Sequence, residues 1–299
     1  MMFRLGFPAV TLWAVGASAH PGGLDTCGGH EDGRSGRYHT HNEEAFCLCE
    51  PEAARCVPDP PSEGNQTVTS FSRAKKLAVA IYDDHPVTFY CGCGVREGHH
   101  VAPGACGYRP KGKPTSTRTK RIEWEHVVPA SLFGETFRAW TEGDPACVSS
   151  KGKPYKGRRC AGKVSEQFRL MEADLYNLVP AIGELNGARS NFDLGVIPGE
   201  AREFGACDFE VRDRLVEPRE AVRGDVARIY LYMDEAYPGR RILTGARRDL
   251  LQHWAAADPV DPWECERARR IEEIQGNPNR VIQRACRAAA RSAAEQERE

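Results

Sequence analysis

Beyond its first twenty residues, the sequence has no apolar run of membrane-spanning length. A helix needs about 20 consecutive apolar residues to cross a bilayer, so we do not expect the mature chain to insert stably into a membrane. The chain also has almost no net charge, because 41 Lys and Arg stand against 42 Asp and Glu. That balance argues against a simple polycation that coats an anionic polymer. We find no internal repeat either.

Cysteine, by contrast, is abundant, with 12 in 299 residues. This number is unusual for a cytosolic enzyme and predicts disulfide bonds formed in an oxidising compartment. The pairing cannot be derived from the sequence. Zinc is a less favoured explanation, because the spacings Cys47-x-Cys49 and Cys91-x-Cys93 are too tight for the usual ligand pairs.

The first nineteen residues have the pattern of a secretory signal. Arg4 supplies the positive start, an apolar run follows over 5–15, and Ala17-Ser18-Ala19 is a small-residue cleavage site. A buried N-terminal helix is the alternative, which Pro8 disfavours. We therefore expect a secreted or periplasmic protein that is cleaved near Ala19.

We expect an α+β fold, mostly helical with a small antiparallel sheet and held by disulfides. The expected segments are a signal peptide (1–19), a His- and Cys-rich module (20–57), a linker (58–66), a main domain (67–290) and a charged tail (291–299). Strands are predicted over 87–91 and 121–128, with loops over 94–120 and 144–163. Helices are predicted over 70–84, 129–140, 165–178, 181–190, 221–237, 243–257 and 264–275.

Charge is unevenly distributed along the chain. Residues 109–169 contain 14 Lys or Arg against 6 Asp or Glu, whereas residues 20–108 contain 7 against 12. The basic stretch is either a solvated loop or a surface for an anion. Phosphodiester backbones are the commonest polyanions, so a nucleic acid is the partner that we consider first.

The stretch Glu123-Trp124-Glu125-His126 places two acids and a histidine together at the end of a predicted strand. A neutral imidazole can take a proton from water, and a carboxylate can bind a hard cation. Neighbouring strand residues point to opposite faces, so Glu125 and His126 can share a site only if the strand ends or distorts there. Pro129 allows such an ending. A purely structural histidine is the alternative.

A second cluster lies between residues 174 and 191. Its three asparagines, one arginine and two acids suit a site for a hard metal and a phosphate better than they suit a core helix. An amide oxygen can bind Mg²⁺ without adding charge. For each asparagine the alternative is a cap or turn residue, which is most credible for Asn186-Gly187.

Several motifs together resemble the bacterial endonuclease I family of exported DNases. They are RIEWEHVVPA (121–130), MEADLYNLVPAIGELNGARSN (171–191), AKKLAVAIYDDHPVTFYCGC (74–93), RGDVARIYLYM (223–233) and WECERARRIEEIQGNPNRVIQRAC (263–286). They occur in the family's order and cover about residues 70–288. The resemblance implies a ββα-metal, or His-metal finger, active site.

The resemblance also implies roles for individual residues. His126 would be the general base, Glu125 and Asn186 would bind Mg²⁺, and Asn177, nine residues before Asn186, would position the site. An arginine before a cysteine would contact the scissile phosphate. In this chain both Arg158 and Arg159 precede Cys160, and the loop is long, with an extra Cys147. Asn177, Arg189 and Lys156 are expected to bind substrate.

The implied reaction is Mg²⁺-dependent hydrolysis of DNA, and possible substitutes for the ion are Mn²⁺ and Ca²⁺. The expected products carry 5′-phosphate and 3′-hydroxyl ends. No helix-turn-helix or zinc-finger motif is present, so binding should be tolerant of sequence. The residues do not distinguish DNA from RNA. We expect a monomer. The competing hypothesis is a noncatalytic extracellular module that binds metal and polyanions.

The segment 20–57 resembles the short YHYH-type, histidine-rich module of exported bacterial proteins. Four histidines, with Asp25 and Cys27, could bind Zn²⁺. These histidines are His20, His30, His39 and His41. A disulfide-held surface module is the equally weighted alternative. In the main domain we expect five cysteines to hold loops against the active centre: Cys91, Cys93, Cys106, Cys147 and Cys160.

Overall fold

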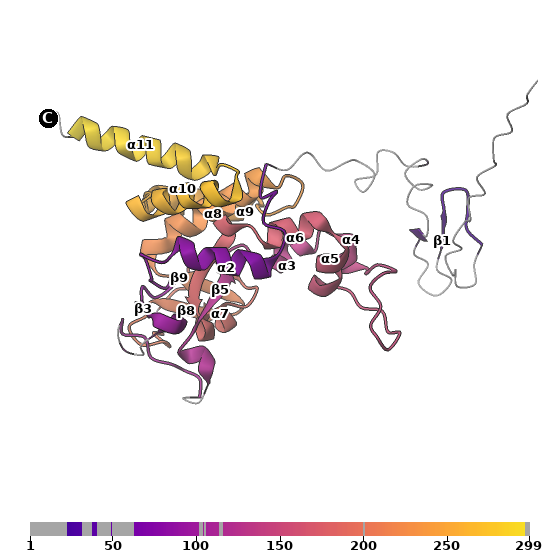
Figure 1. Cartoon of the computed structure of the whole chain (residues 1–299), viewed down its shortest axis with the longest axis horizontal. Helices are drawn as coiled ribbons and strands as arrows, with labels where there is room; N and C mark the ends of the chain where they lie inside the picture. Colours follow the sequence, from indigo (N-terminus) through magenta and orange to yellow (C-terminus); the bar gives the residue numbers. More distant parts are fainter. Residues whose placement is uncertain are drawn as a thin grey trace, which may run out of the picture. The chain divides into compact units, whose positions relative to one another are not determined.

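The structure is a computed structural model of the whole chain. It describes residues 23–31, 38–40, 49, 63–101, 104, 106–113, 116–199 and 201–296. The chain divides into two compact units, 1–60 and 61–299 (Figure 1). The predicted signal segment, and most of the predicted linker, lie outside the described residues. Within the described part, no helix is both long and apolar enough to cross a bilayer.

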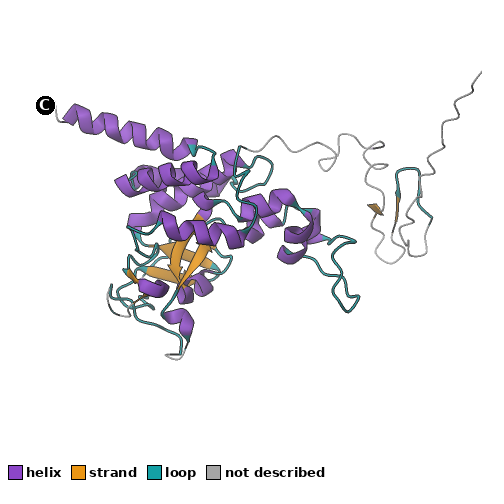
Figure 2. Ribbon diagram, viewed as in Figure 1, coloured by secondary structure: helices purple, strands orange, loops and turns teal. Residues whose placement is uncertain are grey.

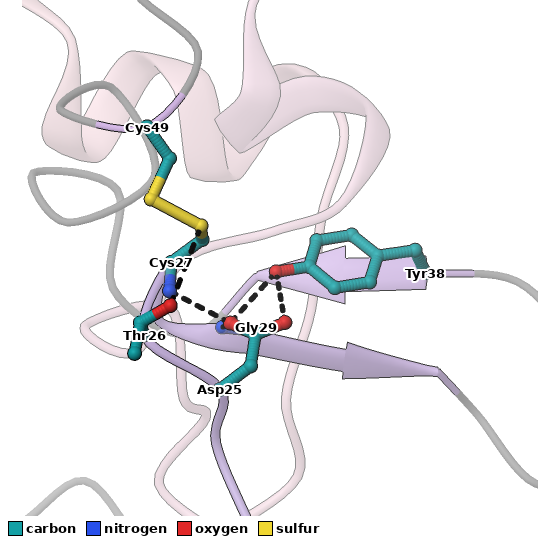
Figure 3. The surroundings of a disulfide bond; sticks show 6 residues. All are labelled: Asp25, Thr26, Cys27, Gly29, Tyr38 and Cys49. Carbon is teal, nitrogen blue, oxygen red and sulfur yellow. Dashed lines mark hydrogen bonds between the residues drawn. A yellow bond between two sulfur atoms is a disulfide. The ribbon is translucent and has the colours of Figure 1, made fainter.

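The N-terminal unit contains a short antiparallel ribbon, in which β1 (Gly29–Glu31) pairs with β2 (Tyr38–Thr40). Asp25 organises the turn before β1: its Oδ1 accepts hydrogen bonds from the backbone N–H groups of Cys27 and Gly29, at 2.8 and 3.2 Å, and its Oδ2 accepts one from the Tyr38 hydroxyl at 2.9 Å. These bonds, chiefly the one from Gly29, lower the pKa of Asp25. A disulfide joins Cys27 to Cys49 beside this turn (Figure 3).

This arrangement corrects part of the zinc hypothesis. Cys27 is in a disulfide and cannot be a thiolate ligand, and the Asp25 carboxylate is occupied by the turn. His30 lies opposite His39 in the ribbon, while His20 and His41 fall outside the described residues. Among the described residues, no three His, Cys, Asp or Glu side chains form a metal-binding group. Zinc binding by the four histidines stays a prediction.

Two antiparallel strands and a helix form the centre of the main unit. Strand β5 (Ile122–His126) pairs with β6 (Leu178–Ile182), in a register that sets Glu125 opposite Val179 and His126 opposite Leu178. Helix α7 (Gly183–Arg189) follows β6 directly. Figure 2 shows the strands of this unit gathered together, with helices around them. The predicted strand 121–128 is confirmed.

Long helices pack near these strands. Helix α2 (Phe71–Ile81) begins after Ser70, whose side chain accepts a hydrogen bond from the Arg73 N–H. The predicted helices over 221–237, 243–257 and 264–275 are confirmed as α8 (Arg223–Ala236), α9 (Gly245–Ala257) and α10 (Pro262–Gln275). Helix α11 (Arg280–Gln296) was not predicted, and it continues through most of the expected charged tail.

The predicted strand 87–91 is wrong. Val87 makes a single bridge to Gly94, and the chain turns at Phe89–Cys91. Gly92, with φ of +66°, donates its N–H to the Thr88 carbonyl and closes the turn. The β-branched and aromatic residues favour a strand, but the turn at Gly92, whose backbone conformation glycine adopts easily, overrides that preference.

Three further segments differ from the prediction. The helix over 129–140 is two short helices, α3 (Ala130–Gly134) and α4 (Arg138–Thr141). The loop over 144–163 ends early in α5 (Arg158–Val164). The helix over 165–178 stops as α6 (Glu166–Glu172), and a 3₁₀ turn (Leu175–Asn177) then leads into strand β6. The Asp174 side chain accepts a hydrogen bond of 3.0 Å from the Tyr176 N–H and so starts this turn.

The remaining strands are short. β3 (Val95–Arg96) pairs with β4 (His100–Val101), while β9 (Leu215–Pro218) lies between β7 (Asp193–Leu194) and β8 (Phe209–Arg212). The mixed α+β class is confirmed. The described disulfides of this unit are Cys91–Cys207, Cys93–Cys106, Cys147–Cys160 and Cys265–Cys286. They include all five cysteines that were expected to hold loops.

Candidate active site

A pocket of about 570 Å³ opens at the end of β5, and we call it the central pocket. It brings together Glu125, His126 and Asn186 from the two sequence clusters. Strand β5 ends at His126, so Glu125 and His126 both line the pocket even though neighbouring strand residues normally point apart. The other lining residues are Phe71, Lys75, Arg121, Ile122, Glu123, Trp124, Pro129, Ala130, Ser131, Trp140, Arg158, Ser190 and Asn191.

His126 is held in one orientation by its surroundings. Its Nε2 lies 2.7 Å from the backbone carbonyl oxygen of Glu172. A carbonyl can only accept, so Nε2 carries the hydrogen and Nδ1 of a neutral ring keeps its lone pair. Burial lowers the pKa of His126 to about 3, which keeps the ring neutral near pH 7. The Phe71 ring packs against the imidazole at a centroid distance of 4.7 Å.

Glu125 is a buried carboxylate, with only 5% of its surface exposed. Burial raises its pKa to about 7, against the opposing effect of the Arg189 guanidinium. Arg189 Nε lies 3.1 Å from Oε1, and the Tyr90 hydroxyl donates to the same oxygen at 3.4 Å. Both contacts use Oε1, so Oε2 is the better placed of the two oxygens to bind another group.

Asn186 lies on α7 and is oriented by Glu123. Its amide Nδ2 donates a hydrogen bond of 3.0 Å to Glu123 Oε2. Glu123 is itself fixed by two arginines, with Arg118 NH2 at 2.6 Å and Arg121 NH2 at 2.8 Å from its oxygens. Since the nitrogen side of the amide is committed to Glu123, its oxygen side is directed elsewhere. Glu123 and Glu125 are two residues apart on β5, as expected for one face of a strand.

Two of the predicted site residues lie behind the pocket wall. Asn177 is fully buried, and its side chain binds the backbone of Val128 twice: Oδ1 accepts from the N–H at 2.7 Å, and Nδ2 donates to the carbonyl at 2.9 Å. Arg189 is also fully buried and donates to the Val127 carbonyl at 2.7 Å. Neither residue lines the central pocket. Both hold the chain that leaves β5.

A buried acid braces the turn that carries Asn177. Asp174 accepts hydrogen bonds from the hydroxyls of Tyr232 at 2.8 Å and Tyr237 at 2.6 Å, and from Gln275 Nε2 at 3.0 Å. Burial raises the pKa of Asp174, although these bonds favour its charged form. The network ties α8 and α10 to the segment between α6 and β6.

The structure separates the two candidate arginines. Arg158 lines the central pocket, and its Nε lies 2.5 Å from Glu172 Oε1. Arg159 does not line the pocket and lies over the Tyr155 ring, 4.4 Å from its centroid. Lys156 is exposed, and its Nζ donates to the Thr141 carbonyl at 2.8 Å. Only Arg158 of these three is placed to meet a group inside the pocket.

The oxygen donors of the pocket fit a hydrated hard cation. Mg²⁺ is usually held by one or two carboxylates together with several waters. Glu125 and Asn186 offer one carboxylate and one amide, which matches that demand. Tight zinc and calcium sites use more protein ligands than these two. Among the described residues, no three His, Cys, Asp or Glu side chains lie close enough together to form such a site.

Sequence reasoning missed two residues that organise this site. Glu172 holds His126 through its carbonyl and Arg158 through its side chain, although it lies 46 residues after the histidine. Nothing local in the sequence indicates that approach. Glu123 was noticed as part of a cluster but given no role, although the two-residue period of a strand could have placed it beside Glu125.

The chain is similar to known proteins over most of its main unit. The family model described as Endonuclease I matches residues 67–286. A periplasmic deoxyribonuclease of Aeromonas hydrophila is 41% identical over 227 residues, 74% of this chain and 88% of that protein. An extracellular deoxyribonuclease of the same organism is 43% identical over 73% of this chain and 90% of its own length.

A less similar relative is also named as an endonuclease. Endonuclease-1 of Buchnera aphidicola is 36% identical over 230 residues, 74% of this chain and 83% of that protein. The matched region contains β5, β6 and α7, and with them every residue of the central pocket. The chain therefore belongs to the endonuclease I family and is a hydrolase of the endonuclease type.

Proposed function

We propose that this protein is an exported, Mg²⁺-dependent endonuclease that hydrolyses the phosphodiester bonds of DNA with little sequence specificity. The observation that carries the proposal is the setting of His126. Its Nε2–H is bound to the Glu172 carbonyl, which leaves Nδ1 as a base in a pocket that also contains Glu125 and Asn186. The relatives named as periplasmic and extracellular deoxyribonucleases support the substrate and the location.

Glu125 and Asn186 would hold the metal ion. When bound, Mg²⁺ supplies positive charge that offsets the phosphate and the oxygen that departs. Glu123 acts as a positioning residue: by accepting from Asn186 Nδ2, it turns the amide oxygen away from itself and makes that oxygen available as a ligand. Mn²⁺ and Ca²⁺ are the ions that we expect to substitute, because they accept the same oxygen donors.

The chain's own residues account for the proton and the charge. His126 Nδ1 removes a proton from a water whose oxygen attacks phosphorus, and the bond from phosphorus to the 3′ oxygen breaks. The departing oxygen takes a proton from solvent, so the products are a 5′-phosphate and a 3′-hydroxyl. Arg158 compensates the negative charge that grows on the phosphate, and it must exchange its contact with Glu172 to do so.

Asn177 and Arg189 support the site from behind the pocket wall. Both are fully buried and bond to the backbone at Val127 and Val128, so we propose that they fix the end of β5 and do not contact DNA. A noncatalytic binding module would not need these buried contacts. Binding alone also does not require a histidine whose Nε2–H is fixed by a hydrogen bond so that Nδ1 is free to accept a proton.

The proposal is tested by incubating the oxidised, full-length protein with supercoiled plasmid. We expect nicked and then fragmented DNA with Mg²⁺, and intact plasmid with EDTA. Cleavage that continues in EDTA would overturn the metal requirement. Binding without cleavage in either condition would support the noncatalytic alternative. A parallel incubation with RNA shows whether the 2′-hydroxyl is tolerated.

A further inference from the structure

The segment between α4 and α5 is the most one-sidedly charged part of the described chain near the central pocket. Between Asp144 and Glu166 there is no acidic residue. The same stretch contains six cations: Lys151, Lys153, Lys156, Arg158, Arg159 and Lys163. In Figure 1 the loop that joins α4 to α5 extends away from the neighbouring helices.

This segment has a defined hairpin conformation. Val148 and Pro154 form an antiparallel bridge, the Ser149 N–H donates to the Lys153 carbonyl at 2.8 Å, and Gly152 turns the tip with φ of +72°. The disulfide Cys147–Cys160 closes the base. We call residues 147–160 the basic hairpin. A preformed surface loses less entropy when it binds a partner.

The cations between Asp144 and Glu166 fall into two groups. Arg158, Lys156 and Lys163 contact Glu172, the Thr141 carbonyl and the Ala146 carbonyl, and Arg159 lies over the Tyr155 ring. Lys151 and Lys153, beside the tip, are exposed and have no acidic partner within the described residues. The tip therefore presents two positive charges that nothing in this part of the chain neutralises.

The base of the hairpin is part of the pocket's surroundings. The Gly157 N–H donates to the Trp140 carbonyl at 2.9 Å. Trp140 lines the central pocket, and so does Arg158, the residue after Gly157. Lys151 lies four residues after Cys147, so the tip is at most roughly 13 Å from the base of the hairpin at about 3.3 Å per residue. Phosphates of one strand of B-DNA are spaced about 3.4 Å apart along the helix axis, so this length corresponds to at most about four nucleotides.

We propose that the basic hairpin is a second binding surface for double-stranded DNA, on which Lys151 and Lys153 contact backbone phosphates that flank the cleaved position. This inference rests on the proposed function. A duplex is favoured over a single strand because single-strand surfaces offer aromatic rings for base stacking. The hairpin's one aromatic ring, Tyr155, is already covered by Arg159.

The test measures binding apart from cleavage. In a His126→Ala background, the double variant Lys151→Ser/Lys153→Ser is titrated with a labelled duplex of about 20 base pairs at several salt concentrations. Each phosphate contact contributes about 0.9 to the slope of log K against log salt. We expect the slope to fall by about 1.8 and affinity at low salt to drop on the order of tenfold. The matched control Arg287→Ser/Arg291→Ser, on exposed positions of α11, should leave the slope unchanged.

Two results would overturn the inference, and a third would overturn the proposed function on which it rests. Equal slopes for the hairpin and α11 variants would remove the hairpin from the DNA-binding surface. An equal loss of affinity for single-stranded DNA or for RNA would overturn the assignment to a duplex. Failure of the protein with His126 intact to cut plasmid with Mg²⁺ would instead overturn the proposed function, whatever the hairpin binds.

Discussion

The central pocket with the buried residues behind its wall, which we call the floor, and the basic hairpin beside it, which we call the rim, are built on opposite principles. On the floor, Asn177 and Arg189 have no exposed surface and bond to backbone atoms in fixed directions. On the rim, Lys151 and Lys153 are exposed and have no acidic partner in the described chain. The contrast teaches that geometry here depends on buried hydrogen bonds, which are directional, whereas binding depends on exposed charge, which adapts to a flexible polymer.

The first test of this contrast uses a floor residue that we propose as a metal ligand. Glu125→Gln keeps the shape of the side chain but removes the charge that favours a cation. We expect the Mg²⁺ concentration for half-maximal cleavage to rise at least tenfold, since losing even an outer-shell partner usually costs 10- to 100-fold. Calorimetric Mg²⁺ binding gives a readout independent of activity. The control is Glu203→Gln, an acid outside the pocket, and an unchanged Mg²⁺ titration for Glu125→Gln would refute the ligand role.

The next effect compares two neighbouring arginines. Arg158→Ala should lower kcat by about 10²–10³, the usual cost of removing one group that stabilises charge in a transition state. Arg159→Ala should cost only a few-fold, because Arg159 lies over Tyr155 and outside the pocket. Single-turnover cleavage of one duplex measures both. Equal losses of kcat would contradict the assignment of Arg158, and not Arg159, as the arginine that stabilises the phosphate.

A buried residue that we propose does not contact DNA should affect the stability of the fold. Asn177→Ala leaves the Val128 N–H and carbonyl without partners in the interior. Each unsatisfied buried group costs about 1–3 kcal/mol, so we expect the free energy of unfolding to fall by about 2–4 kcal/mol. Urea denaturation measures this, with the exposed Asn191→Ala as control. Equal midpoints for the two variants would contradict the positioning role.

The smallest effect is expected at Lys156, on the rim. Its ammonium group is exposed and already donates to the Thr141 carbonyl. Lys156→Ala should weaken DNA binding only a few-fold and lower the salt slope by no more than about one. Anisotropy titrations across salt concentrations measure both. A loss larger than that of Lys151→Ser/Lys153→Ser would move the main contact from the tip of the hairpin to its base.

Local sequence was enough to predict part of this site. The pair Glu125 and His126 lies in one short motif, and the resemblance to the endonuclease I family added Asn186, nine residues after Asn177. The position of Pro129 also indicated that the strand would end near His126. These features are local because each depends on a single strand or on one strand–helix junction.

Other features depend on contacts that the sequence does not display. Strand β6 is wholly buried, and a short buried run cannot be told from helix by its periodicity. The choice between Arg158 and Arg159 depends on how α5 is rotated, because successive helical residues point about 100° apart. The double role of Glu172 requires the end of α6 to approach β5, which only tertiary packing determines.

The central claim is that the floor performs the chemistry while the rim holds the DNA. The most direct measurement is the single-turnover cleavage rate of His126→Ala, taken together with its affinity for the same duplex. We predict a rate loss of about 10²–10⁴, typical for removal of a general base, with a dissociation constant within about twofold of the unaltered protein. A retained rate, or a rate and an affinity that fall together, would contradict the account.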